Sequence, residues 1–250
     1  MTDFQNDIAI VTGAARGLGS HIANALLKDG YKVCLTDLSE DGLASYRAPD
    51  GIGADRYATA RLDVREKGDF ERVLAQVTNA WGDAHVLVNC AAVTRTTPLF
   101  EISPEEFSQV MDINLRGTFL GSQVFGSYFR DRGYGRIVNI ASLAAQNGGT
   151  ATGAHYAASK GGIITLTKVF ARDLAAKGVT VNAIAPGPLD VPLMQEILTE
   201  ETLGNMPGLI PVGRMGDPAF IGRIVCLLAS RQAVSMTGAT VDANGGLYVR

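Results

Sequence analysis

The fold is decided by the stretch IAIVTGAARGLG, which runs from Ile8 to Gly19. Its first four residues are apolar and mostly β-branched, and such a run predicts a parallel strand buried on both faces. Residues 20–29 carry apolar side chains at helical spacing and stop at Gly30, which predicts a helix. A strand, a glycine-rich turn and a helix in that order favour a dinucleotide-binding unit over an ordinary tight turn, because glycines let the backbone approach a pyrophosphate at the helix N-terminus.

The next predicted strand, Tyr31–Thr36, ends at Asp37, 18 residues after Gly19. A carboxylate at this point can accept hydrogen bonds from the ribose hydroxyls of adenosine and repels a 2′-phosphate, so it favours NAD over NADP. Arg16 has the opposite tendency, because a guanidinium beside the turn can pair with a 2′-phosphate. We give Asp37 more weight, since an arginine can move into solvent. A simple turn residue at the strand end remains the alternative for Asp37.

Strands alternate with helices along the chain. We expect strands at Ile8–Val11, Tyr31–Thr36, Arg56–Leu62, His85–Cys90, Arg136–Ala141, Val179–Ala185 and Ala239–Asp242, and helices at 20–29, Asp69–Trp81, Ser103–Arg130, His155–Lys177, about Pro192–Gly204 and Asp217–Ala229. This order predicts an α/β chain with a single-domain Rossmann fold over residues 1–250, in which a doubly wound parallel sheet has helices on both faces. We expect a lid at about 190–213.

Polar residues and breakers follow the predicted strands. They are Asp37, Asp63, Asn89, Ser142 and Pro186. In open α/β sheets, ligands bind beyond the carboxyl ends of the strands, so these residues and the glycine turn are predicted to share one crevice.

Tyr156 and Lys160 are spaced i, i+4 in the predicted helix His155–Lys177, which places the phenol and the ammonium on one face. A nearby cation favours the phenolate, so we expect Lys160 to lower the pKa of Tyr156 and make it a usable general acid/base. The alternative is an exposed helix that carries the two residues by chance.

Together these residues resemble the classical short-chain dehydrogenase/reductases from about Ile8 to Gly246. The pattern TGxxxGxG matches at residues 12–19, and the resemblance identifies a catalytic tetrad of Asn114, Ser142, Tyr156 and Lys160. The cofactor-binding residues that we predict are Gly13, Arg16, Gly17, Leu18, Gly19, Asp37, Leu38, Asp63, Val64, Asn89, Ala91, Tyr156, Lys160, Pro186, Gly187 and Leu189. Asp63 would accept from the adenine amino group, and the Leu189 backbone would hold the carboxamide.

The chain departs from the family pattern at two places. The usual NNAG reads Asn89-Cys90-Ala91-Ala92, for which we expect a slightly tighter cofactor wall. Where many members carry a threonine after the Pro-Gly segment, this chain has Val191, so one hydrogen bond to the carboxamide is expected to be missing.

By this resemblance the reaction is reversible hydride transfer between a secondary alcohol and nicotinamide, with Tyr156 moving the proton. Ser142 would donate to the substrate oxygen, and Lys160 would bind the nicotinamide ribose. Asn114 would hold a water that links Lys160 to solvent, with a hydrogen bond between helices as the alternative. No metal is required. His155 is expected to be a solvated residue at the helix start, and His85 is not needed.

The predicted substrate wall is mainly apolar. It comprises Leu143, Ala144, Gln146, Thr150, Thr152, His155, Pro188, Met194 and Leu198. No Lys or Arg occurs between Gly178 and Gly213, whereas several acidic residues do, which makes the lid a poor partner for phosphate, coenzyme A or an acyl-carrier protein. We therefore expect a neutral, fairly hydrophobic secondary alcohol, aryl-alkyl or cyclic, and its ketone, with NAD as cofactor.

Two other functions stay open. An NADPH-dependent 3-oxoacyl-acyl-carrier-protein reductase is one, since the chain also resembles these enzymes and a basic docking face could come from Arg130, Arg132, Arg136, Arg172 and Lys177. A non-catalytic dinucleotide-binding redox sensor is the other, although such a protein should have lost part of the tetrad.

Composition excludes several classes of protein. The net charge of −3 and the 19% of charged residues do not indicate a basic surface that could bind nucleic acid. No apolar stretch is long enough to span a membrane. Three dispersed cysteines are expected to be small buried apolar residues, without a disulfide or metal site. We expect a cytoplasmic homotetramer that associates through the helices Ser103–Arg130 and His155–Lys177, as the family resemblance implies.

Overall fold

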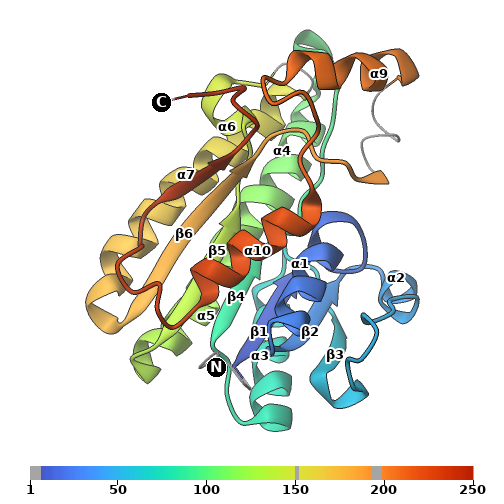
Figure 1. Ribbon diagram of the computed structural model, residues 1–250. Helices are drawn as coiled ribbons and strands as arrows, with labels where there is room; N and C mark the ends of the chain where they lie inside the picture. The colour runs from blue at the N-terminus through green and yellow to red at the C-terminus, as the bar shows by residue number, and fades with distance from the viewer. Residues whose placement is uncertain (1–6, 150–151, 193–198, 250) are drawn as a thin grey trace.

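The structure, a computed structural model, describes residues 7–149, 152–192 and 199–249. It contains a seven-stranded parallel sheet with the order β3-β2-β1-β4-β5-β6-β7 (Figure 1). The strands are β1 (Ile8–Thr12), β2 (Lys32–Asp37), β3 (Tyr57–Arg61), β4 (Val86–Asn89), β5 (Gly135–Ile140), β6 (Val179–Pro186) and β7 (Thr240–Ala243). The chain winds outward from β1 in one direction and from β4 in the other, which confirms the doubly wound Rossmann topology.

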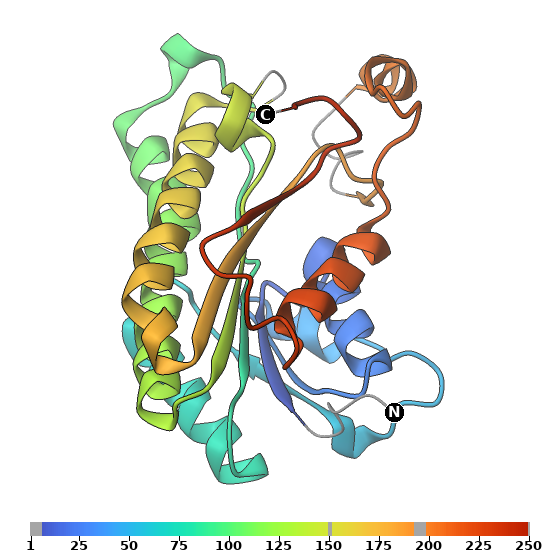
Figure 2. The same ribbon diagram turned by 60° about the vertical axis from the view of Figure 1, so that its left-hand side comes forward.

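Helices cover both faces of this sheet (Figure 2). On one face lie α1 (Gly17–Lys28), α2 (Glu40–Ala44) and α10 (Pro218–Ala229), and on the other lie α3 (Lys67–Trp81), α5 (Gly117–Arg132) and α7 (Ala154–Leu174). The shorter elements are α4 (Pro104–Met111), α6 (Ala144–Asn147), α9 (Glu200–Leu209), η1 (Ala54–Arg56), η2 (Leu99–Glu101), η3 (Asp112–Arg116) and η4 (Ala175–Lys177).

Strand β1 shows why the sequence folds this way. Ile8 and Ile10 join the core under α3, α5 and α7, whereas Ala9 and Val11 join the core under α1 and α10. Successive side chains of a strand point to opposite faces, so an uninterrupted apolar run requires cover on both sides. The prediction of a strand buried on both faces is confirmed.

The long helix expected at Ser103–Arg130 differs from the prediction in one respect. It begins as predicted, with the Ser103 hydroxyl accepting from the Glu106 backbone N–H at 3.1 Å and Pro104 in the first turn. At residues 112–116 it passes through one π-helical turn, η3, before it continues as α5. Asn114 lies in this turn, where the side chain of a poor helix former can point inward.

Two other helix boundaries also differ. Helix α7 ends at Leu174, three residues before the predicted end, and the chain closes with the 3₁₀ turn η4 before Gly178 at φ +76°. The lid helix expected at about Pro192–Gly204 falls partly on residues 193–198, which lie outside the described part. The described helix α9 begins later, after the N-cap Thr199, and runs to Leu209.

Candidate active site

The glycine turn after β1 has the shape that a dinucleotide needs. Gly17 has φ +57°, and Gly13 has φ +67° and lies so close to the loop after β4 that a β-carbon would come within 2.7 Å of the Ala91 Cα. A β-carbon on Gly19 would overlap the Gly13 carbonyl. Only glycine fits these positions, and the turn leads directly into the N-terminus of α1, where backbone N–H groups attract phosphate. The residues present therefore fit the pyrophosphate of a nicotinamide dinucleotide.

Asp37 lies at the end of β2, beside this turn. Its Oδ2 accepts from the Ala15 N–H at 3.1 Å, and its Oδ1 accepts from the Ser39 N–H at 3.0 Å. The carboxylate is thus fixed against the glycine turn, at the end of the strand where an adenosine ribose is expected. Arg16 is exposed, and so is Leu38, at 52%.

Two other predicted cofactor residues already have internal partners. The Asp63 carboxylate is bound by the Arg65 guanidinium, with Arg65 Nη2 2.6 Å from Asp63 Oδ2, and this hydrogen bond lowers the pKa of Asp63. The Asn89 side chain donates to Ser122 Oγ at 3.1 Å and to Asn139 Oδ1 at 2.8 Å, inside the protein. Any contact of Asn89 with a cofactor would have to come from its backbone. Val64 is buried and packs against Gly117 at the start of α5.

Three of the four predicted catalytic residues meet at the carboxyl end of β5. Ser142 follows this strand, and Tyr156 and Lys160 lie in the first turns of α7. The Lys160 Nζ lies 5.7 Å from the centre of the Tyr156 ring, and Ser142 lies near enough to the Tyr156 hydroxyl to lower its pKa. The prediction that the phenol and the ammonium share one helix face is confirmed.

The electrostatic coupling of this pair differs from the prediction. The Lys160 Nζ donates to the Ile140 carbonyl at 2.7 Å, and burial lowers the pKa of Lys160 to about 8. Burial raises the pKa of Tyr156, and hydrogen bonds with Ser142 and Thr94 offset only part of that rise. The pKa of Tyr156 is therefore raised, and not lowered as predicted, because burial disfavours the phenolate and Lys160 is not among the groups that lower the pKa.

Asn114 is fully buried and joins three segments. Its Oδ1 accepts from the Val93 N–H at 2.8 Å, and its Nδ2 donates to the Val93 carbonyl at 3.0 Å and to Ser159 Oγ at 3.1 Å. The bond to Ser159 is the link between helices that the sequence left open. Both edges of the Asn114 amide are therefore committed within the protein.

The Pro-Gly segment follows β6. The Pro186 carbonyl accepts from the Leu143 N–H at 2.8 Å, and a β-carbon on Gly187 would come within 2.8 Å of the Asn244 Cα. Leu189 is buried and forms a bridge with Gly216, which anchors the start of the segment that we expected to be a lid.

Thr94 and His155 are the site residues that sequence reasoning missed or misplaced. Thr94, in the loop after β4, lies near enough to the Tyr156 hydroxyl to lower its pKa. His155 was expected to be solvated, but it is fully buried, and its Nε2 lies 2.7 Å from Glu106 Oε1. The expectation was wrong because the partner lies 49 residues away in the sequence. The sequence offered one hint of a partner for His155, namely the charged Glu106 in the third position of α4.

The cysteines are free, as predicted, but only Cys34 is fully buried. Cys90 replaces an asparagine of the family pattern and directly follows β4, where Lys160 and Asp37 both act on it electrostatically. Burial raises the pKa of the Cys90 thiol to about 12, so it is a neutral group at physiological pH.

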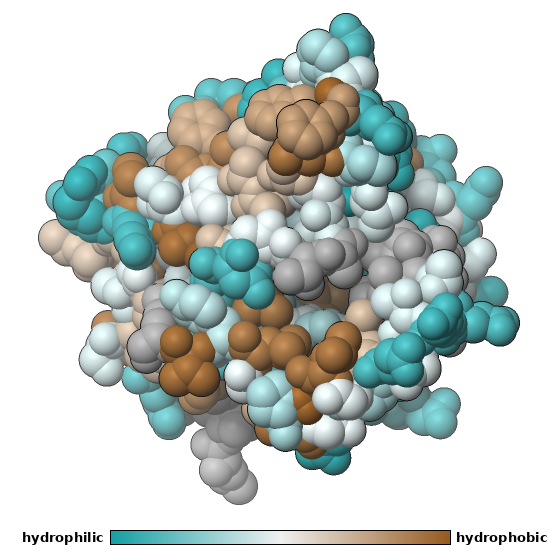
Figure 3. Space-filling model, turned by 90° about the horizontal axis from the view of Figure 1, so that it is seen from above, coloured by the Kyte–Doolittle hydropathy of each residue, from teal (hydrophilic) through white to brown (hydrophobic). Residues whose placement is uncertain are grey.

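Figure 3 looks down on this end of the molecule, where apolar side chains are exposed among hydrophilic ones. Leu209 at the end of α9 is 69% exposed, and Val212 just beyond it is 62% exposed. Of the predicted substrate wall, Thr150, Met194 and Leu198 lie outside the described residues. The carrier-docking face is not supported at Arg136, which is 2% exposed and donates to backbone carbonyls.

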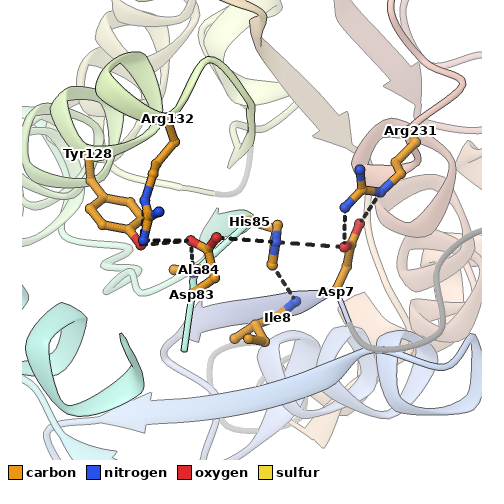
Figure 4. A network of polar contacts seen from close by, with 8 residues as sticks. All are labelled: Asp7, Ile8, Asp83, Ala84, His85, Tyr128, Arg132 and Arg231. Atoms are coloured by element: carbon orange, nitrogen blue, oxygen red, sulfur yellow. Dashed lines mark hydrogen bonds and ion pairs between the residues drawn. The ribbon is translucent and has the colours of Figure 1, made fainter. Parts of the chain in front are cut away.

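A polar network lies at the opposite end of the sheet, at the amino ends of the central strands (Figure 4). His85 Nδ1 accepts from the Ile8 N–H at 3.1 Å, and its Nε2 lies 3.8 Å from Asp7 and 3.9 Å from Asp83. Within the described ranges, no group of three His, Cys, Asp or Glu residues could hold a metal ion, and no helix is long and apolar enough to cross a membrane.

Comparisons with known proteins agree with this geometry. A family model described as enoyl-(acyl carrier protein) reductase matches residues 13–248. The chain is 36% identical to the 3-oxoacyl-[acyl-carrier-protein] reductase of Vibrio cholerae over 247 residues, which cover 99% of both chains. It is 37% identical to the acetoacetyl-CoA reductase of Shinella zoogloeoides over 242 residues, 96% of this chain and 98% of the relative.

The chain belongs to the short-chain dehydrogenase/reductase family. A short-chain dehydrogenase from Bacillus anthracis has the same fold, with a TM-score of 0.88 and 29% identity over 98% of this chain and 97% of that one. As a short-chain dehydrogenase/reductase, the protein is an oxidoreductase that uses a nicotinamide dinucleotide.

Proposed function

We propose that the protein is an NAD(H)-dependent reductase of 3-oxoacyl esters or thioesters, which interconverts the 3-oxo and 3-hydroxy forms. The convergence of Ser142, Tyr156 and Lys160 at the end of β5 carries this proposal. The two curated relatives described above are named as reductases of 3-oxoacyl groups and are similar over nearly the whole chain. These names favour the 3-oxoacyl function over a dehydrogenase of simple alcohols.

In this proposal Tyr156 gives its proton to the substrate carbonyl oxygen during reduction and takes it back during oxidation. Ser142 donates a hydrogen bond to the same oxygen and stabilises the negative charge that develops there. Lys160 holds the nicotinamide ribose from the same helix face. When bound, the nicotinamide supplies or accepts the hydride. Asn114 fixes the loop after β4 and the start of α7 through Val93 and Ser159.

The preference for NAD(H) rests on Asp37. Its carboxylate is held by the Ala15 and Ser39 N–H groups, so it cannot turn away without losing both hydrogen bonds. A 2′-phosphate at this place would meet a fixed negative charge. The remaining predicted binding residues, among them Gly13, Gly17, Gly19 and Leu189, are part of this proposal.

A second candidate is a dehydrogenase of a neutral, fairly hydrophobic secondary alcohol. The observation that favours it is the weakness of any basic docking face. Arg136 is buried, and Arg130 and Arg172 each contact the adjacent aspartate, at 2.9 Å and 3.3 Å. For the same reason, we propose a free ester or thioester as the substrate instead of one carried by a protein. A redox sensor without catalysis is disfavoured, because all four tetrad residues are present.

We also propose that the chain forms a single domain and assembles as a homotetramer through α5 and α7. An apolar groove of about 540 Å³ lies on these helices and is lined by Leu115, Phe119 and Leu166 among others. Phe119 and Val169 are more than one-third exposed on this face. Light scattering should give a mass of four chains, and a monomer mass would contradict this assembly.

Initial rates test the proposed function. Purified protein is assayed with acetoacetyl-CoA, ethyl acetoacetate and an aryl-alkyl ketone, each with NADH and with NADPH. We expect the highest kcat/KM for a 3-oxoacyl compound with NADH. A higher value for the aryl-alkyl ketone would favour the second candidate, and a higher value with NADPH would contradict the role of Asp37.

A further inference from the structure

A small cavity lies at the amino ends of β5 and β6, at the end of the sheet opposite the candidate active site. The loop between α10 and β7 closes it on one side, and the turn η4 closes it on another (Figure 1). Its volume is about 240 Å³. A water molecule takes up roughly 30 Å³ in the liquid, so the cavity has room for a small organic ion.

Arg136 and Thr180 form one wall of this cavity. They are paired in the parallel register of β5 and β6, so they are direct neighbours. Val138, two residues after Arg136, belongs to the core under α1 and α10, and Val181, next to Thr180, belongs to the opposite core. Because side chains alternate between the faces of a sheet, both wall residues point to the face that α10 covers. The loop at 230–239 lies on that face.

Arg136 brings a positive charge to this wall. The residue is 2% exposed, and all of its hydrogen bonds to described residues go to backbone carbonyls, at 2.9–3.3 Å. These carbonyls belong to Gly135, Gly178, Ser230 and Arg231.

The carboxylate of Asp7 acts on Arg136 electrostatically, but it is itself bound by the Arg231 guanidinium at 2.6 Å. Burial lowers the pKa of Arg136. The charge of the Arg136 guanidinium is therefore only weakly compensated. A guanidinium has five N–H groups, and the four hydrogen bonds to carbonyls leave at least one of them for a ligand.

Two threonines add hydroxyl groups to the cavity lining. Thr180 is 6% exposed, and its Oγ1 is buried without a hydrogen-bond partner among the described residues. Thr237 Oγ1 accepts from the Val181 N–H at 3.1 Å, which leaves the hydrogen of this hydroxyl for donation. A buried hydroxyl without a partner costs free energy, so the Thr180 hydroxyl points to a ligand that accepts a hydrogen bond from it.

We propose that this cavity binds a small carboxylate, which Arg136, Thr180 and Thr237 hold through its oxygens. The guanidinium supplies the opposite charge, and the two hydroxyls donate hydrogen bonds to the ionised group. Ala175 and Val234 line the same cavity and contact the carbon end of the ligand, which favours a short carboxylate over an inorganic anion. The site is separate from the proposed reaction and takes no part in it.

Acetate is the probe, and saturation-transfer NMR of its methyl group measures the binding in a chloride-free buffer. We expect saturable binding to the wild-type protein. In Thr180→Val, the Kd should rise at least about tenfold, because a hydrogen bond to a charged acceptor is lost. Acetamide has a similar shape but no charge, so it should bind the wild-type protein at least about tenfold more weakly than acetate.

Thr59→Val is the matched control, since it removes an exposed threonine hydroxyl from β3 and should leave the Kd unchanged. Acetate that binds at the glycine turn contributes equally in all these proteins, so a difference between them reports on the cavity. Thr180→Val removes a hydroxyl that has no partner, and urea unfolding without acetate should show no loss of stability.

Val234 is 69% exposed at the mouth of the cavity, so Val234→Trp should obstruct entry and weaken acetate binding without changing a polar group. This variant decides the question if Thr180→Val fails to fold. The absence of saturable binding to the wild-type protein, or equal Kd values for wild type and the folded cavity variants, overturns the proposal. Acetamide that binds as tightly as acetate also overturns it, because the cavity would then recognise shape and not charge.

Discussion

Each end of the sheet carries a buried or half-buried histidine beside carboxylates, but the two sites are built differently. The amino ends of the strands are called the amino edge below, and the carboxyl ends the carboxyl edge. At the amino ends of the strands, His85 bonds to the Ile8 backbone through Nδ1 and faces Asp7 and Asp83 through Nε2 (Figure 4). At the carboxyl ends, His155 meets Glu106 through Nε2, and its Nδ1 has no partner among the described residues.

The surroundings of the two histidines differ in the same way. Around His85, each carboxylate has a cation or hydroxyl of its own, since Arg231 Nη2 lies 2.6 Å from Asp7 and the Tyr128 hydroxyl donates to Asp83 at 2.7 Å. Around His155, the carboxylate of Glu106 is shared, since its Oε1 also accepts from Thr97 in the loop after β4. We therefore expect the contacts at the amino ends of the strands to stabilise the fold. The carboxyl ends, where α/β sheets bind their ligands, carry the proposed active site.

The largest effect that this contrast predicts is the loss of turnover in Tyr156→Phe. Removing the hydroxyl removes the proton donor, so kcat should fall by roughly 10²–10⁴-fold, the usual contribution of general acid/base catalysis. Tyr128→Phe is the matched control, because it deletes the corresponding hydroxyl at the other edge. We expect it to keep its kcat and to lose about 1 kcal/mol of unfolding free energy in urea. Equal kcat values for Tyr156→Phe and wild type would remove the functional distinction between the edges.

Arg136 should give the largest effect on stability at the amino edge. It is 2% exposed, its Nε donates to the Ser230 carbonyl at 3.0 Å, and its Nη1 donates to the Gly135 carbonyl at 2.9 Å. The guanidinium also stacks 4.5 Å from the Tyr134 ring centre. Arg136→Met leaves these carbonyls without donors, so we expect the free energy of unfolding to fall by about 2–4 kcal/mol.

Urea denaturation measures this loss. The exposed Arg132, which is 3.7 Å from Asp83, provides the comparison, since Arg132→Met removes only a surface ion pair and should cost less than about 1 kcal/mol. If the two arginine variants lost the same stability, the buried guanidinium would have no special structural role.

The sequence predicted the strands well because their signals are local. Ile8–Val11 is an apolar run and residues 179–185 are mostly apolar, and both are bounded by turns. Buried parallel strands have little freedom to end elsewhere. The placement of Ser142 and Asp37 followed from the same rule, since Asp37 ends β2 and Ser142 lies two residues beyond the end of β5.

Contacts between distant residues were not predictable in this way. The π-helical turn at Asn114 depends on a partner in the loop after β4, and the burial of His155 depends on Glu106, 49 residues before it. The bond from Lys160 to Ile140 likewise joins a helix to a strand. A single sequence gives helical spacing but not which side chains meet across elements, so the electrostatics of Tyr156 were predicted with the wrong sign.

At the carboxyl edge, Asp37→Ser should change cofactor choice. The serine hydroxyl can still bond locally, but the negative charge beside the 2′ position is gone. We expect the ratio of kcat/KM with NADPH to that with NADH to rise by about 10–100-fold, which corresponds to about 1.4–2.8 kcal/mol. Glu40→Gln removes an exposed negative charge nearby and should leave the ratio unchanged. If the ratio stayed at the wild-type value in Asp37→Ser, Asp37 would be a turn residue and nothing more.

The smallest effect concerns the pH dependence of stability at the amino edge. Burial lowers the pKa of His85, as do Arg231 and Arg132, whereas Asp7 and Asp83 act in the opposite direction. Between the unfolded pKa of about 6.5 and the lower folded value, the unfolded chain holds a proton that the folded protein lacks. His85 therefore leaves stability intact above about pH 6.5 and reduces it as the pH falls through this window, with a slope of at most about 1.4 kcal/mol per pH unit.

His85→Asn should flatten that part of the profile. The asparagine oxygen can still accept from the Ile8 N–H, but it does not titrate, so urea unfolding at a series of pH values should show a shallower acid-side slope than the wild-type protein. At pH 7.5 the two proteins should differ little, because the histidine is neutral there in both states. Profiles that run parallel from pH 7 to pH 5 would mean that His85 takes up its proton equally in the folded and unfolded chains. The carboxylates Asp7 and Asp83 would then compensate fully for its burial.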